Sequence, residues 1–557
     1  MNTSLVQERD HGVSVQLPAS SMDEQLASWK EIAAYLRRDV RTVQRWEKTE
    51  GLPVRRHRHR ELESVYALKS ELDSWRESRQ PSRPSEASSP LAAKARRRLA
   101  VLPFDNLSGD PEQEYFSDGL TEEMIAKLGR LHPERLGVLA RTTMMKYKGT
   151  TKSINEIDSE LGVDYFLEGS VRRDDQRVRI TAQLIKVSDQ THLWAESYDR
   201  TVGDILAVQI EVAEKIARSL AVELLPEEHA ALTRSSTANA AAHDAYLRGR
   251  YFWNRRTEEN FSKAIESFQH AVDIDPGYGA AYAGLADCFD TLGWYGALPA
   301  EEAYRKAKAA ALHALQIDDR LAEAHAALAY AKHFYEWNWE EIEKEYRCAL
   351  ELDSNYVTAH HWYALFLASM GRFGEALVQM DCALDLDPLS LVINSHLGWI
   401  LYFARLNERA VKQLQETVKM DPQFAVGRYF LGMAYEQCQQ YAAAIKEFEA
   451  ARAFGGEHPG PIAALIHASG LAGKMSDAKR HLESLKNAAR RRHVSPYFFA
   501  LAYAGMGESG DAFTWLDHAF QERSGWLVNL NIDPAMDPLR SDPRFTDLLR
   551  RVGLPVK

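Results

Sequence analysis

The strongest constraint on the fold is an internal repeat of 34 residues in the second half of the chain. The segments EALVQMDCALDLDP (375–388) and RAVKQLQETVKMDP (409–422) align at this offset. Alanine recurs at the same offset, at Ala376, Ala410, Ala444, Ala478 and Ala512. Periods of this length are typical of solenoids, in which each repeat buries its apolar face against its neighbours. The pattern therefore predicts a helical array over residues 243–523.

Each repeat fits a helix-turn-helix unit. The small alanine of the second helix lies twelve positions after a Gly or Ala in the first, and Asp-Pro pairs at Asp387 and Asp421 end the second helix. These positions resemble the tetratricopeptide repeat. We count about eight units, and we interpret residues 524–557 as a C-terminal cap. The resemblance implies a superhelix whose groove binds a protein or peptide partner. We assign its histidines to packing or to that groove, and not to metal: His325, His333, His360 and His361.

A basic cluster stands out near the N-terminus of an acidic chain. The net charge of the chain is −11, whereas residues 37–60 hold nine basic and three acidic residues. Such a local excess is the electrostatic footprint of a polyanion site. We expect residues 1–27 to be a disordered tail and residues 80–97, with three prolines and four serines in 81–97, to be a linker.

Two helices are predicted between these segments. Ser28 and Glu31 have the spacing of a capping box at the start of a helix over 28–36. A second helix is expected from about residue 40 to 50. Helical periodicity places Val40, Val43 and Trp46 on its packed side. The opposite side offers long donors that can reach phosphates and base edges, namely Arg41, Gln44, Arg45 and Lys48.

The segment VRRHRHRELESVYAL then predicts two short strands around a charged bend, followed by a closing helix with Leu72 and Trp75 inward. The motif RTVQRW followed by EGLPV resembles the excisionase- and MerR-like winged helix-turn-helix domains. This resemblance implies binding of double-stranded DNA by residues 28–79. It places Arg41, Thr42, Gln44, Arg45 and Lys48 in the groove, and Arg55, Arg56, Arg58 and Arg60 on a wing. The alternative is a solvated basic helix on a small adaptor fold.

Residues 98–225 alternate between strand-like and helical patterns, and residues 163–200 predict a three-stranded antiparallel meander. The motifs PFDNLSGDPEQEYFSDGLTEEMI, LGVDYFLEGSVRR and HLWAESYDR resemble the TolB-N-terminal or FlgO-like α/β domain of bacterial regulators. This domain carries no catalytic signature. Ser117 and Asp118 have no histidine at hand, so we expect them to cap the start of a helix.

Together these patterns predict a multidomain chain: a small winged helix-turn-helix, an α/β domain and an all-α repeat solenoid. The function that follows is a cytoplasmic bacterial transcription regulator that binds DNA and a protein partner. The alternative is an interaction scaffold that binds no DNA. We expect no enzyme, because no phosphate-binding loop, nucleophile elbow or kinase motif set occurs. We also expect no cofactor, no metal and no membrane segment; a homodimer would suit paired half-sites.

Overall fold

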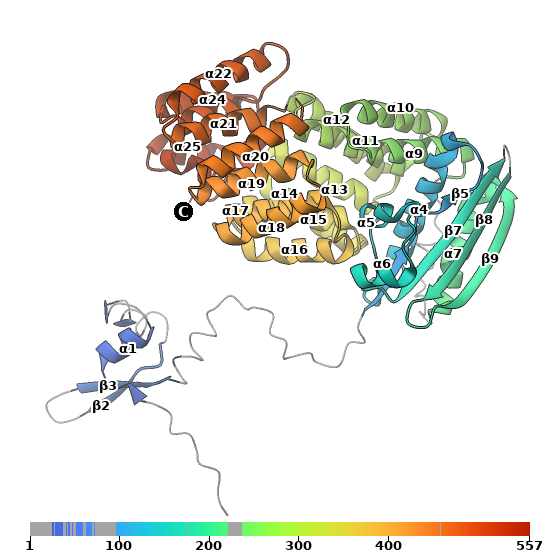
Figure 1. Ribbon diagram of the computed structural model, residues 1–557, viewed down its shortest axis with the longest axis horizontal. Coiled ribbons are helices and arrows are strands. Elements are labelled where there is room, and N and C mark those ends of the chain that lie inside the picture. The colour runs from blue at the N-terminus through green and yellow to red at the C-terminus, as the bar shows by residue number, and fades with distance from the viewer. Residues whose placement is uncertain are drawn as a thin grey trace, which may run out of the picture. The chain divides into compact units, whose positions relative to one another are not determined.

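The computed structural model describes the chain in two compact units, which divide between Ala93 and Lys94. Figure 1 shows both. The described residues are 25–26, 28–36, 40–41, 43–44, 47, 52–58, 63–69, 72, 96–174, 177–220, 237–456 and 458–556.

The first unit combines a helix with a small antiparallel sheet. Helix α1 (Trp29–Leu36) starts as expected, because the Glu31 N–H donates to Ser28 Oγ at 3.2 Å. Strands β2 (Arg55–Arg58) and β3 (Glu63–Leu68) form the predicted hairpin, and β1 (Gln25–Leu26) pairs with the other edge of β3. Strand β1 thus lies inside the segment 1–27 that was expected to be a disordered tail. The buried core comprises Ile32, Ala33, Leu36, Val43, Leu52, Ala67 and Leu72.

The second unit begins with a mixed sheet whose strand order is β6-β4-β7-β8-β9, with β5 on β7. The predicted meander is confirmed, because β7, β8 and β9 pair antiparallel. Strand β4 pairs in parallel with both β6 and β7. The strands are β4 (Arg97–Val101), β5 (Asp105–Asn106), β6 (Leu136–Val138), β7 (Tyr165–Asp174), β8 (Arg177–Lys186) and β9 (Thr191–Thr201).

Within the described residues 96–174 and 177–220, four α-helices accompany the sheet. Met124 and Leu128 of α4 pack with Val212 and Ile216 of α7 in the main core of this domain. Ser153 caps α6 through the Glu156 N–H, and Gly162 ends that helix in the left-handed region (φ 63°). The helices are α4 (Glu114–Gly129), α5 (Arg141–Met144), α6 (Ile154–Leu161) and α7 (Ile205–Ser219).

Eight helix pairs follow within the described residues 237–456 and 458–556, in agreement with the predicted repeat. The Asp-Pro pairs act as expected, since α16 ends at Leu386 and α18 at Met420. The pairs are α9 (Ala240–Trp253) and α10 (Glu258–Ile274), α11 (Gly279–Trp294) and α12 (Ala300–Ile317), α13 (Ala322–Ala331) and α14 (Trp339–Leu352), α15 (Val357–Ser369) and α16 (Phe373–Leu386), α17 (Leu391–Phe403) and α18 (Asn407–Met420), α19 (Ala425–Gln437) and α20 (Tyr441–Phe454), α21 (Pro459–Leu471) and α22 (Met475–Ala489), and α23 (Pro496–Gly505) and α24 (Ser509–Gln521).

The two helices of a pair differ in burial. In α15 every residue from Ala359 to Ser369 is buried, as expected for a helix that is apolar on all sides. In α16 burial follows one stripe, Ala376, Met380 and Ala383. The first helices therefore form an inner layer of the array, and the second helices form an outer layer that faces solvent.

The segment after the last pair does more than cover the end of the array. It contains η5 (Gly525–Asn529), η6 (Pro534–Leu539) and α25 (Pro543–Val552). Trp526 stacks on Trp294 of α11 with ring centroids 5.1 Å apart. Asp533 accepts hydrogen bonds of 2.8 Å from the hydroxyls of Tyr402 in α17 and Tyr497 in α23. This C-terminal segment thus packs on part of the inner layer of the array, whereas the sequence predicted only a cap on its end.

Candidate DNA interface and interdomain site

Only part of the predicted DNA interface lies among the described residues. Arg41 is helical and exposed, and Gln44 is helical and half-buried. Arg55, which is exposed, shares β2 with Arg56 and Arg58. The remaining predicted contacts lie outside the described residues: Thr42, Arg45, Lys48 and Arg60. The structure thus gathers three arginines into one strand of a hairpin, and Val43 is buried as the helical pattern requires.

A second candidate site lies where the α/β domain meets the repeats. Helix α4 lies between the sheet and the first repeats in Figure 1, and α4 contacts α9. A cavity of about 500 Å³ opens there. Its walls come from α4 and α5 on one side and from α9, α11, α13, α15 and α17 of the inner layer on the other.

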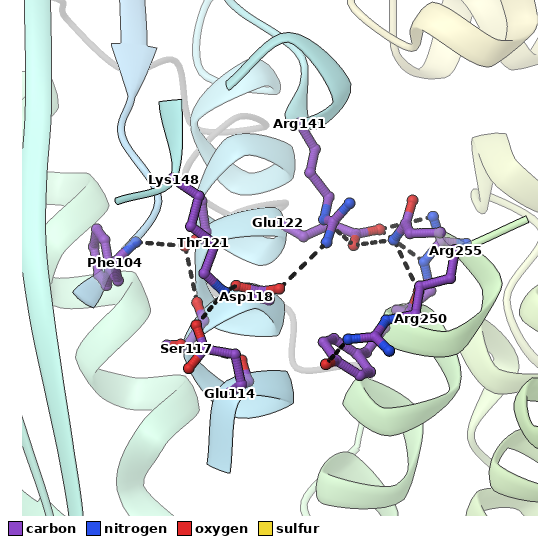
Figure 2. Close-up of polar contacts among 12 residues, drawn as sticks. Phe104, Glu114, Ser117, Asp118, Thr121, Glu122, Arg141, Lys148, Arg250 and Arg255 are labelled. Carbon is purple, nitrogen blue, oxygen red and sulfur yellow. Dashed lines mark hydrogen bonds and ion pairs between the residues drawn. The ribbon is translucent and has the colours of Figure 1, made fainter. Parts of the chain in front are cut away.

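Glu122 is the centre of the polar contacts at this junction (Figure 2). It accepts from Arg250 at 2.7 Å and Asn254 at 2.8 Å, both in or next to α9, and lies 3.1 Å from Arg141 Nε. Burial opposes ionisation of Glu122, but the charges of Arg250 and Arg141 outweigh it and lower its pKa. Arg250 also pairs with Asp287 of α11 at 3.1 Å. One carboxylate therefore ties α4, α5 and the first repeats together.

Ser117 and Asp118 do not cap a helix, so that expectation is wrong. Helix α4 already begins at Glu114, because Asp110 caps a preceding 3-10 turn, Pro111–Gln113. Asp118 lies in the second turn of α4, where it is buried and paired with Lys148 and Arg141 (Figure 2). Burial raises its pKa despite these cations. Its role is to anchor α4 to the segment around α5.

Three further residue pairs attach the α/β domain to the third and fourth repeats. Asp387, at the end of α16, accepts from the Thr143 N–H at 2.9 Å and the Thr143 hydroxyl at 2.7 Å. Burial raises the pKa of Asp387 to about 6 in spite of these hydrogen bonds. Asn355 donates to the Gly129 carbonyl, and Arg130 pairs with Asp353 at 3.4 Å. Asp387, which belongs to the Asp-Pro pair that ends α16, thus also binds the α/β domain. The repeat pattern did not predict this second role.

The histidines of the repeats are held by neighbouring side chains. His325 bonds Glu345 at 2.6 Å and His333 bonds Ser369 at 3.1 Å. His360 bonds Gln379, and His361 bonds His396 in the wall of the 500 Å³ cavity. Burial lowers the pKa of His396 to about 3. These contacts fit packing, one of the two roles that the sequence left open for these histidines.

Comparisons with known proteins add two family matches. The second domain of HilA/YgeH-like transcriptional regulators matches residues 95–215, and the tetratricopeptide repeat matches residues 427–451. The chain therefore carries a HilA/YgeH-like regulator domain followed by repeats that imply protein partners. Among the described residues, no helix is long and apolar enough to cross a membrane.

Two curated proteins are similar in sequence to part of this chain. A Rhizobium meliloti protein with the provisional name adenylate cyclase 3 is 39% identical over 250 residues, which are 44% of this chain and 42% of that protein. The transcriptional regulator HilA of Salmonella typhimurium is 24% identical over 325 residues, 58% of this chain and 51% of HilA. This chain thus spans about half the length of these curated relatives.

Among solved structures, PilF of Pseudomonas aeruginosa is 21% identical and covers 37% of this chain and 92% of its own, with a TM-score of 0.29. The tetratricopeptide repeat protein YrrB is 17% identical and covers 36% of this chain and 98% of its own, with a TM-score of 0.25.

Proposed function

We propose that the chain is a DNA-binding transcription regulator whose first unit is a winged helix-turn-helix domain. The observation that supports this most directly is the β2–β3 hairpin, which carries Arg55, Arg56 and Arg58 within a segment of strong positive charge. Arg41 is helical and exposed in the same unit. Long cationic donors on a helix and a hairpin suit a duplex, because phosphates position the protein and base edges specify the site. The similarity to HilA supports the same class.

The second unit would receive a signal or a partner. In this proposal the α/β domain is of the TolB/FlgO-like type, the repeats bind a protein, and the whole chain works in the cytoplasm, as a dimer where the operator has paired half-sites. We propose no enzymatic activity. The similarity to the Rhizobium protein covers 42% of that protein, and the sequence holds no phosphate-binding loop, nucleophile elbow or kinase motif set.

Gel-shift assays with promoter DNA test the proposal. We expect Arg41→Ala and Arg45→Ala to abolish or strongly weaken the shifted band, because each removes a contact to the duplex. The melting temperature of the Arg41→Ala protein should stay unchanged, since Arg41 is exposed. Arg480→Ala removes an exposed arginine from α22 of the repeats and is the matched control, with no expected effect.

Deleting residues 1–80 separates the regulator from the scaffold alternative. A regulator loses promoter binding and its effect on transcription, while the remaining chain keeps its protein partners. Unchanged transcription after the deletion, together with no DNA binding by the full chain, would favour the scaffold.

A further inference from the structure

A second cavity of about 490 Å³ lies inside the repeat array. It touches the interdomain cavity, because Arg256, Trp294 and Tyr295 line both. Its walls come from the first two repeats, from α19 and the segment after α20, and from Trp526 of η5. Cavities of this size hold small molecules.

The walls of this cavity are aromatic. Trp294 and Trp526 both lie in the wall and stack on each other with ring centroids 5.1 Å apart. Tyr295, Tyr429 and Phe430 line the cavity beside the two tryptophans. Flat aromatic faces favour a flat ring, because offset stacking adds to the burial of apolar surface.

Arg256 supplies a cation that forms no ion pair with a described residue. It lies in the turn between α9 and α10, with its guanidinium 3.7 Å from the centre of the Trp253 ring. Among the described residues, no carboxylate oxygen lies within ion-pair distance of this guanidinium. The side chain of Arg256 is exposed to the two cavities that it lines. A guanidinium that stacks through its face keeps its in-plane donors for a carboxylate or phosphate.

The other charged groups of the cavity leave it positive. Arg492 faces Glu258 at 3.7 Å, a long ion pair that balances one positive charge. His458 is neutral, because burial and the neighbouring Arg492 lower its pKa to about 4. Asp287 also acts on Arg256, but only at a distance, because its ion pair of 3.1 Å is with Arg250.

We propose that this cavity binds a small aromatic anion, a flat ring that carries a carboxylate or a phosphate. Arg256 would hold the anionic group, and the ring would lie among Trp294, Phe430 and Trp526. A long peptide fits the inner layer less well, because α4 and α5 cover the first repeats and the segment after α24 covers the later ones. The proposal goes beyond the proposed function and does not depend on DNA binding.

Isothermal titration calorimetry with the full chain tests this site. The probes are 2-naphthoate, 2-naphthyl phosphate, the uncharged 2-naphthamide, and acetate and inorganic phosphate as anions without a ring. We expect at least one of the charged naphthyl probes to bind about tenfold or more tightly than the amide, with no binding of acetate or inorganic phosphate. The stronger of the two charged probes identifies the carboxylate or the phosphate as the natural group.

Two variants make the test specific. Arg256→Gln should lose about tenfold or more of the affinity for the charged probes and none for the amide. Glutamine suits this position, because Gln439 adopts the same left-handed conformation (φ 58°, against 54° for Arg256) in a corresponding turn. Arg255→Gln, which changes the neighbouring arginine on Tyr251, should leave affinity unchanged. Equal affinity for acid and amide, full binding by a folded Arg256→Gln protein, or no binding of any probe at millimolar concentration would overturn the proposal.

Discussion

Asp290 in α11 is a deeply buried acidic residue. Its side chain is fully buried, and neither carboxylate oxygen has a hydrogen bond among the described residues. Burial, and the nearby charge of Asp287, raise its pKa well above the usual range. A buried carboxylate without a cation is unstable in its charged form, so this residue favours folding only while protonated.

Asp290→Asn should therefore stabilise the protein at neutral pH. The folded-state pKa lies above the unfolded one, so stability present at low pH is lost as pH rises towards the folded pKa. The amide variant avoids this loss. We expect a higher melting temperature than the native chain at pH 7 and a difference that shrinks towards pH 4. A constant difference across this range would contradict the assignment.

At the scale of elements, close helix packing depends on small residues in the inner layer. A Cβ added at Gly432 of α19 would lie 2.4 Å from Cε1 of Phe448 in α20. The repeat pattern predicted this small position, and the structure shows the ring that needs it.

Gly432→Ala should destabilise the array by about 1–3 kcal/mol, because Phe448 must leave its place. Chemical denaturation of the full chain measures the loss. Gly510→Ala in α24 is the control, since its Cβ would meet no atom within 4 Å. Equal stability of the two variants would show that Phe448 can move without cost.

The sequence predicted the elements unevenly. Helix ends at Asp387 and Asp421 and the meander of residues 163–200 follow from local rules of termination and alternation. The parallel pairing of β4 with β6 and β7 does not follow from local rules, because it joins segments that are far apart in the chain. The start of α4 was misplaced for a local reason: a 3-10 turn capped by Asp110 precedes it.

At the scale of the second unit, the α/β domain and the repeats are joined by charged contacts and not by a shared repeat pattern. Thr143 and Asp387, for example, lie 244 residues apart. Such contacts carry no periodicity, so the sequence predicted the order of these modules but not their junction. For the same reason, cavities that need both modules were beyond prediction.

Glu122→Ala should uncouple the two modules. Removing the carboxylate that two largely buried arginines share costs about 3 kcal/mol, because Arg250 then keeps only Asp287, and Arg141 only Asp118, as a paired acid. We expect calorimetry to show an earlier, separate transition for the α/β domain. Glu259→Ala, which breaks an exposed pair with Lys263, should change little. Identical calorimetric traces for both variants would mean that other contacts suffice.

The position of Trp526 also bears on how the protein is made. During synthesis the ribosome releases Trp294 more than two hundred residues before the tryptophan that stacks on it. Until that later segment emerges, the nascent early repeats expose an aromatic surface that other proteins can bind, which makes translation of the second half of the chain the period when a chaperone is most needed.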